Sequence, residues 1–265
     1  MNKKNPLVIG HRGASALMPE NTLESFRLAF GEHAADMIEL DVHLSRDGIP
    51  VVIHDETLER TTNGQGFVAN KTFAELKSLN AGYGFDPEKN FTFPTRDRQI
   101  RIPSLEEVFQ EFPNKRLAIE IKAVAPGLVQ KVLDLVEKFN AVERCTVGSL
   151  EDSVFQELQR LDAPTRIFTS RKAAQRLVIE YFLCRKHPSK KPRLAASLPV
   201  ENKYFDLKKK SWIDWLHDKE ILVYYWTVNN PDLMRTLAER GADGIMSDDP
   251  GLIRRTLLPA GGTAP

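Results

Sequence analysis

The feature that most constrains the fold is a regular alternation between short β-branched runs and amphipathic helical stretches. Eight such runs occur in the 265 residues, at Leu7–Gly10, Met37–Leu44, Leu117–Lys122, Cys145–Ser149, Thr165–Ser170, Arg193–Ser197, Ile221–Trp226 and Ala242–Ser247. Strands that alternate with helices over short connections form right-handed βαβ units and a parallel sheet. Eight units in about 250 residues favour a closed (β/α)8 barrel, the TIM barrel, over an open sheet.

Helix start signals fit between these runs. Asn21 is followed three residues later by Glu24, which is the spacing of a capping box, so we expect Asn21 to cap the first helix. Asp249 stands directly before Pro250 and predicts an N-cap followed by proline at the first helical position.

One segment interrupts the alternation. Residues 56–103 are far longer than the usual βα loop of about 2–6 residues, and we interpret them as an insertion after the second strand. This insertion is expected on the face of the barrel that carries active sites, with a short helix over Thr72–Leu79. We therefore expect residues 1–258 to form one barrel domain and residues 259–265 to form a flexible tail.

Composition excludes several classes of partner. The chain has 37 Lys and Arg against 36 Asp and Glu, so it lacks the basic excess of a nucleic-acid or anionic-membrane binder. Two cysteines rule out a disulfide scaffold. No signal-peptide core or membrane-spanning run is present, so we expect a cytoplasmic protein without a membrane anchor. No pattern indicates an oligomeric state.

Polar residues gather where the first two runs end. His11 and Arg12 follow the first run, and the planar fork of arginine suits an anionic phosphate, although a surface ion pair is the alternative. Glu39 and Asp41 alternate along the second run and share its inward face. Two buried carboxylates repel each other, and a hard divalent cation removes that repulsion. His43 continues the same face, but we expect it to be solvated and leave it out of the site.

The third run repeats this arrangement with Glu120 and Lys122, which form either part of a three-carboxylate cation site or a core salt bridge. His54 supplies a second imidazole, and the adjacent Asp55 has the right chemistry to orient its ring; a structural histidine is the alternative. Trp226 closes the seventh run and is expected to line a pocket or to pack in the core.

Several strings together resemble the glycerophosphodiester phosphodiesterase family, in its soluble, bacterial-like form. They are HRGASALMPENT, IELDVHLSRDGIPVVIHDETLERTTNGQG, IEIK, YYWTVNN and GADGIMSDDP, in family order from Leu7 to about Pro250. The resemblance implies a TIM barrel with a family-type insertion. It also implies that His11 and His54 are the acid–base pair. Arg12 and Lys122 then bind phosphate, with Trp226 as a substrate contact, and one divalent cation, Mg²⁺ or Ca²⁺, is held by Glu39, Asp41 and Glu120.

The activity implied is metal-dependent hydrolysis of small glycerophosphodiesters to glycerol 3-phosphate and an alcohol, by way of a cyclic phosphate. We favour His11 as the initial base, although the sequence does not decide between the two histidines. The alternatives are a lysophospholipase-D-like phosphodiesterase and a non-catalytic barrel that binds a phosphate ligand. A lysophospholipid substrate would favour an apolar rim, and five phenylalanines of the insertion form either such a rim or a small core: Phe67, Phe73, Phe85, Phe91 and Phe93.

Overall fold

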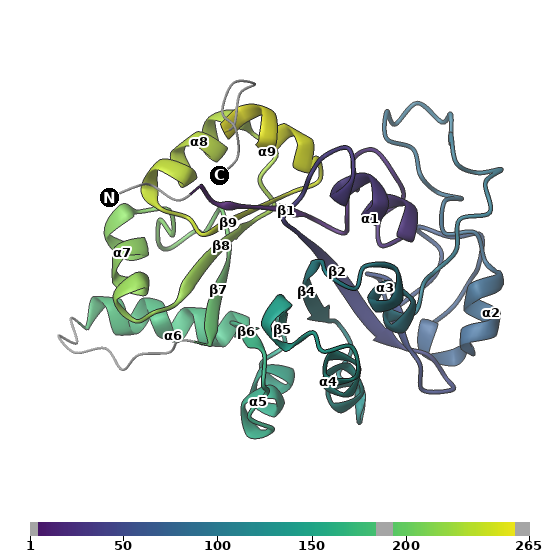
Figure 1. Ribbon diagram of the computed structural model, residues 1–265, viewed down its shortest axis with the longest axis horizontal. Helices are drawn as coiled ribbons and strands as arrows, with labels where there is room; N and C mark the ends of the chain where they lie inside the picture. The colour runs from purple at the N-terminus through teal and green to yellow at the C-terminus, as the bar shows by residue number, and fades with distance from the viewer. Residues whose placement is uncertain (1–4, 184–192, 258–265) are drawn as a thin grey trace.

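Eight parallel strands close into a barrel within residues 5–183 and 193–257, the parts of the chain that the computed structural model describes (Figure 1). They are β1 (Leu7–Gly10), β2 (Met37–Leu44), β4 (Arg116–Ile121), β5 (Cys145–Gly148), β6 (Arg166–Phe168), β7 (Leu194–Pro199), β8 (Leu222–Trp226) and β9 (Gly244–Ser247). Closure is complete because β1 pairs in parallel with both β2 and β9. The predicted TIM barrel is confirmed.

Helices surround this barrel on its outer side (Figure 1). They are α1 (Leu23–Phe30), α3 (Leu105–Glu111), α4 (Leu128–Lys138), α5 (Asp152–Arg160), α6 (Arg171–Phe182), α7 (Lys210–Asp218), α8 (Pro231–Arg240) and α9 (Pro250–Leu257). Outward-facing strand residues such as Ile38, Leu40 and Val42 are fully buried in the main core with the helices. A separate, smaller cluster fills the barrel and includes Ile9, Phe168 and Tyr224. Alternate residues of each strand therefore serve two different cores.

The segment after β2 is an insertion with a core of its own. Strand β3 (Pro50–Val52) turns back antiparallel to β2, and a 3₁₀ turn (Val68–Asn70) and helix α2 (Phe73–Ser78) follow. Helix α2 confirms the short helix expected there, with Thr72 and Glu75 forming its capping box. Eight buried residues make up the insertion core: Val51, Ile53, Leu58, Val68, Leu76, Ala81, Ile100 and Ile102.

The five phenylalanines of the insertion do not share one environment. Phe73 packs against the insertion core, whereas Phe67 is 50% exposed and Phe91 is 83% exposed.

The extent of a single domain over residues 1–258 stays a prediction, and the predicted tail over 259–265 lies outside the described residues.

One of the two predicted helix caps is wrong. Thr22, not Asn21, caps α1, because the Thr22 hydroxyl accepts from the Ser25 backbone N–H at 3.2 Å. Asn21 has a left-handed φ of 58° and turns its side chain toward β2 instead. The cap at Asp249 is confirmed, since its Oδ1 accepts from the backbone N–H of Leu252 at 3.1 Å.

Gly13 shapes the turn that leads from β1 toward α1. Its φ is 91°, a conformation that favours glycine, and a Cβ atom at this position would lie 2.3 Å from Ser25 Oγ. That hydroxyl already accepts from the Ala14 N–H at 2.9 Å and donates to the Arg12 carbonyl at 3.1 Å. The turn is therefore packed too closely on α1 to admit a larger residue.

We expect Gly13→Ala to lower the free energy of unfolding by roughly 1–3 kcal/mol, because backbone strain and overpacking act together. Gly66→Ala is the matched control: φ is 87° there, but no atom lies within 4 Å of the added Cβ, so strain acts alone. Urea denaturation measures both losses. Equal losses in the two variants would contradict a steric role for the contact with Ser25.

Candidate active site

The predicted site residues meet at the carboxyl ends of the strands, around a cavity of about 310 Å³ that we call the C-terminal cavity. Most of the charged lining comes from β1, β2, β4 and the loops after them, and Arg171 of α6 adds one cation from the other half: His11, Arg12, Glu39, His54, Glu120, Lys122 and Arg171. Later strands and their loops supply a mainly apolar wall that includes Leu150, Phe168, Tyr224, Trp226 and Met246. Polar chemistry and apolar contact are thus divided between the two halves of the barrel.

Two buried carboxylates and one half-buried carboxylate cluster in this site. Glu39, Asp41 and Glu120 each place one oxygen within 4.8 Å of the others, and Asp41 pairs with Glu120 in the register of β2 and β4. Burial, followed by the charges of Asp41 and Glu120, raises the pKa of Glu39 well above its usual range. Burial and Asp41 likewise raise the pKa of Glu120. Hard oxygen donors that repel one another in this way fit a divalent cation of the Mg²⁺ or Ca²⁺ type.

Two cationic side chains border the carboxylates. The Arg12 backbone N–H donates to Glu39 Oε2 at 3.0 Å, and its Nε lies 3.3 Å from Asp41 Oδ2 without a hydrogen-bond partner in the described structure. Burial disfavours the guanidinium charge, but Asp41, Glu20 and Glu39 outweigh it and raise the pKa of Arg12. Lys122 Nζ lies 3.2 Å from Glu120 Oε1, which is the salt bridge that the sequence offered as an alternative. Both residues of this pair also line the cavity.

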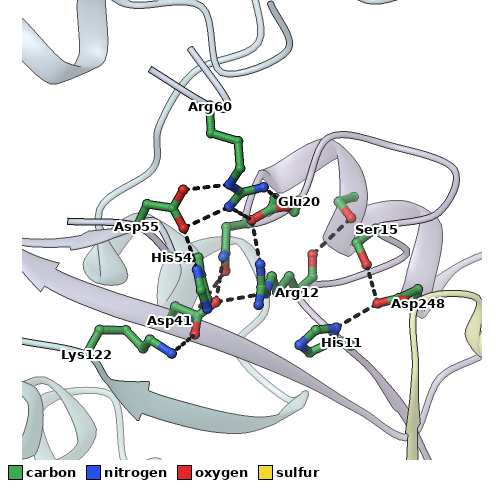
Figure 2. Close-up of polar contacts among 12 residues, drawn as sticks. His11, Arg12, Ser15, Glu20, Asp41, His54, Asp55, Arg60, Lys122 and Asp248 are labelled. Carbon is green, nitrogen blue, oxygen red and sulfur yellow. Dashed lines mark hydrogen bonds and ion pairs between the residues drawn. The ribbon is translucent and has the colours of Figure 1, made fainter. Parts of the chain in front are cut away.

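Each of the two imidazoles is held by a carboxylate (Figure 2). His11 Nδ1 lies 2.6 Å from Asp248 Oδ1, and His54 Nδ1 lies 2.6 Å from Asp55 Oδ1. Burial alone would raise the pKa of Asp248, but bonds from His11, Asn229 and other donors lower it to about 2. Because Nδ1 of both rings is engaged, Nε2 is the nitrogen available to a molecule in the cavity.

An outer chain of ion pairs connects the insertion to this site (Figure 2). Arg60, from the insertion, donates from Nε to Asp55 at 2.6 Å and from Nη1 and Nη2 to Glu20 at 2.8 and 2.7 Å. Glu20 also accepts from Arg12 Nη1 at 2.8 Å. Burial opposes ionisation of Glu20, but Arg60 and Arg12 lower its pKa to about 2. Arg60 therefore holds both Asp55, the carboxylate partner of His54, and Glu20, the carboxylate that binds Arg12.

Sequence reasoning misplaced one residue of this region and missed others. His43 is only 7% exposed, not solvated, and its Nε2 lies 3.0 Å from the His54 carbonyl oxygen; burial lowers its pKa. Asn21 donates to Asp41 Oδ2 at 2.8 Å and accepts from the Asp41 N–H at 3.2 Å. Asn21 and Asp248 both stand in strings that carry the family resemblance, PEN and SDDP, which is the signal that marks them.

Comparison with known proteins assigns the family. Residues 11–252 match the model of the glycerophosphoryl diester phosphodiesterase family. A glycerophosphodiester phosphodiesterase of Caldanaerobacter subterraneus is 33% identical over 249 residues, which cover 92% of this chain and 94% of that protein. The chain belongs to the glycerophosphoryl diester phosphodiesterase family. It is accordingly an enzyme, a phosphoric diester hydrolase, and the alternative of a non-catalytic barrel is set aside.

Two further relatives of the family bear on the substrate. A phosphodiesterase of Oleispira antarctica, solved in complex with the product sn-glycerol-3-phosphate, is 26% identical with a TM-score of 0.75, covering 96% of this chain and 97% of that one. A human lysophospholipase D is 28% identical over 276 residues, covering 93% of this chain and 84% of that protein. Among the helices of the described residues, none has the length and apolar character needed to cross a bilayer.

Proposed function

We propose that this phosphodiesterase hydrolyses glycerophosphodiesters to glycerol 3-phosphate and an alcohol, with one divalent cation and a pair of histidines. The observation that carries the proposal is that two carboxylate-held imidazoles line one cavity of about 310 Å³ together with Glu39 and Glu120, which cluster with the buried Asp41. The family membership and the glycerol phosphate complex of the Oleispira relative support the substrate class.

Glu39, Asp41 and Glu120 would hold the cation, which when bound supplies neutralisation of phosphoryl charge and acidifies a coordinated hydroxyl. Arg12 and Lys122 flank this position and donate to the phosphate oxygens. Arg12 Nε has no hydrogen-bond partner in the described structure, so a phosphate oxygen supplies the acceptor that this buried donor needs.

His11 and His54 exchange the protons. In the first step one imidazole accepts the proton of the glycerol hydroxyl beside the phosphoester, while the other donates a proton to the leaving alkoxide oxygen. A phosphorus–oxygen bond forms within the glycerol half as the bond to the alcohol breaks, which gives a cyclic phosphate. Water then opens that ring with the two roles reversed. We assign His11 as the initial base, with Asp248 holding its Nδ1.

The activity test is incubation with glycerophosphocholine and glycerophosphoethanolamine, with and without a chelator, while glycerol 3-phosphate is assayed. We expect glycerol 3-phosphate from both substrates and none in the presence of chelator. Lysophosphatidylcholine is run beside them, because the apolar wall with Leu150 and Phe168 and the 83% exposed Phe91 favour lysophospholipids as a second candidate substrate. Turnover of lysophosphatidylcholine alone would replace the proposed substrate by that candidate.

Glu120→Gln is expected to weaken divalent-cation binding and turnover together, each by about tenfold or more, since a charged ligand is lost. The fold should persist because the change relieves repulsion with Asp41. Calorimetric titration with Mg²⁺ and with Ca²⁺ measures the affinity. Glu106→Gln, which breaks only an exposed pair with Lys138, is the control. Unchanged cation affinity in Glu120→Gln would remove Glu120 from the cation site.

The pH dependence of kcat/KM is expected to be bell-shaped around neutrality, because the two imidazoles act in opposite protonation states. Measurement of kcat/KM across pH tests this shape. A flat profile from about pH 5 to 9 would exclude the two-histidine mechanism.

A further inference from the structure

The opposite end of the barrel holds a second, larger cavity of about 730 Å³, which we call the N-terminal cavity. Four arginines line it, one at the start of each of four neighbouring strands: Arg116, Arg144, Arg166 and Arg193. The pairing of Leu117 with Cys145 places Arg116 beside Arg144, and the pairing of Ile167 with Leu194 places Arg166 beside Arg193. Strand register therefore brings the four arginine positions together at one end of the barrel. The Arg144 guanidinium is already engaged there, because it lies over the Phe109 ring at 5.3 Å and donates to the Lys115 carbonyl at 2.7 Å.

The positive charge of this cluster is incompletely compensated. The Arg116 side chain has no hydrogen-bond or ion-pair partner within residues 5–183 and 193–257. Arg193 Nη1 donates to the Ala163 carbonyl at 3.5 Å and lies 3.8 Å from the 97% exposed Asp162. Two acidic residues, Glu143 and Asp243, also line the cavity, but Asp243 already accepts from the Val223 N–H at 2.8 Å and pairs with His217 at 2.8 Å.

The N-terminal cavity is a place separate from the C-terminal cavity. Tyr224 lines both and is 4% exposed, so its side chain forms part of the partition between them. Glu39 and Glu120 of the three-carboxylate cluster line the C-terminal cavity and not the N-terminal cavity. An anion in the N-terminal cavity therefore meets guanidinium groups rather than the carboxylates of the cation site.

We propose that the N-terminal cavity binds a small anion that carries two or more phosphoryl groups. Guanidinium groups present paired donors that match phosphate oxygens, and those of Arg116, Arg166 and Arg193 around one cavity fit several phosphoryl groups better than one. The volume, more than twice that of the C-terminal cavity, leaves room for such an anion. This site takes no part in the hydrolysis of the glycerophosphodiester and stands independently of the proposed function.

The test is calorimetric titration of the metal-free protein with inorganic pyrophosphate at low ionic strength, where screening is weak. We expect saturable binding at one site, weaker binding of orthophosphate, and a 10- to 100-fold loss of pyrophosphate affinity in Arg116→Gln. Arg116 has no partner in the described parts of the chain, so its replacement breaks no contact, and an unchanged melting temperature verifies this. Arg193→Gln is a second variant in which the same loss is expected.

Two control variants separate this site from the alternatives. Arg235→Gln removes an equal charge from the exposed surface of α8, where Arg235 pairs with Asp232, and should leave pyrophosphate affinity unchanged. Lys122→Gln alters the C-terminal cavity and should also leave it unchanged. Absence of saturable binding would overturn the proposal. So would a loss in Lys122→Gln with none in Arg116→Gln, or an equal loss in Arg235→Gln.

Discussion

Deletion of the glycerol hydroxyl beside the phosphoester is expected to abolish turnover of glycerophosphocholine rather than merely to weaken its binding. In the proposed mechanism this hydroxyl is the nucleophile, held within the substrate itself. Intramolecular delivery of a well-oriented nucleophile is worth about 7–11 kcal/mol of the barrier in favourable cases. A substrate without the hydroxyl would keep the proposed phosphate contacts with Arg12 and Lys122, so we expect kcat to fall below detection and the loss of affinity to be much smaller.

Steady-state kinetics on glycerophosphocholine and its deoxy analogue measures this difference, and inhibition of the normal reaction by the analogue reports its binding. Glycerophosphoethanolamine is the control, because it changes the alcohol and retains the hydroxyl. The alcohol leaves toward the mainly apolar wall that contains Trp226, so we expect similar turnover of both natural substrates. Comparable turnover of the deoxy analogue would rule out the cyclic phosphate and favour direct attack by water.

Replacement of either catalytic-site histidine should lower kcat by about 10²- to 10⁴-fold with little change in KM. His11→Gln and His54→Gln keep a side chain of similar polarity but remove the proton exchange. The kcat of the double variant is expected to be only slightly lower than that of the less active single variant. Each step needs both groups, and the effects of such residues on kcat are not additive.

His33→Gln is the matched control for these variants. This histidine also faces a carboxylate, with Nδ1 3.7 Å from Asp249, but it does not line the C-terminal cavity. Its replacement should leave kcat unchanged. If the losses in His11→Gln and His54→Gln instead appear in KM with kcat intact, the two rings bind substrate without transferring protons.

The barrel could be predicted from the sequence because its signals are local. Alternation along β2 places Glu39 and Asp41 on the inner face and Leu40 on the outer, and this pattern is visible within eight residues. The same reasoning was wrong for His43, whose place at the end of β2 predicts that its side chain is exposed to solvent. The insertion covers this end, and the His54 carbonyl gives the ring a buried partner.

The ion pairs around the site could not be predicted, because they join residues far apart in the chain. Arg60 contacts Glu20, 40 positions away, and no periodicity relates the two. Asn21 shows a second limit. Its spacing from Glu24 suggests a helix cap, but its side-chain oxygen accepts from the Asp41 N–H and its amide donates to Asp41 Oδ2. Asn21 therefore binds β2, and Thr22 caps α1.

The bond between His11 and Asp248 spans 237 positions of the chain and has a consequence for biosynthesis. All three carboxylates of the proposed cation site are synthesised before half of the protein has been made, yet the partner of His11 is synthesised almost last. The nascent chain is therefore expected to remain inert toward phosphodiesters until β9 seals the barrel against β1. Prematurely terminated products that lack this strand should carry no oriented His11, so the cell is spared partial activity from incomplete copies.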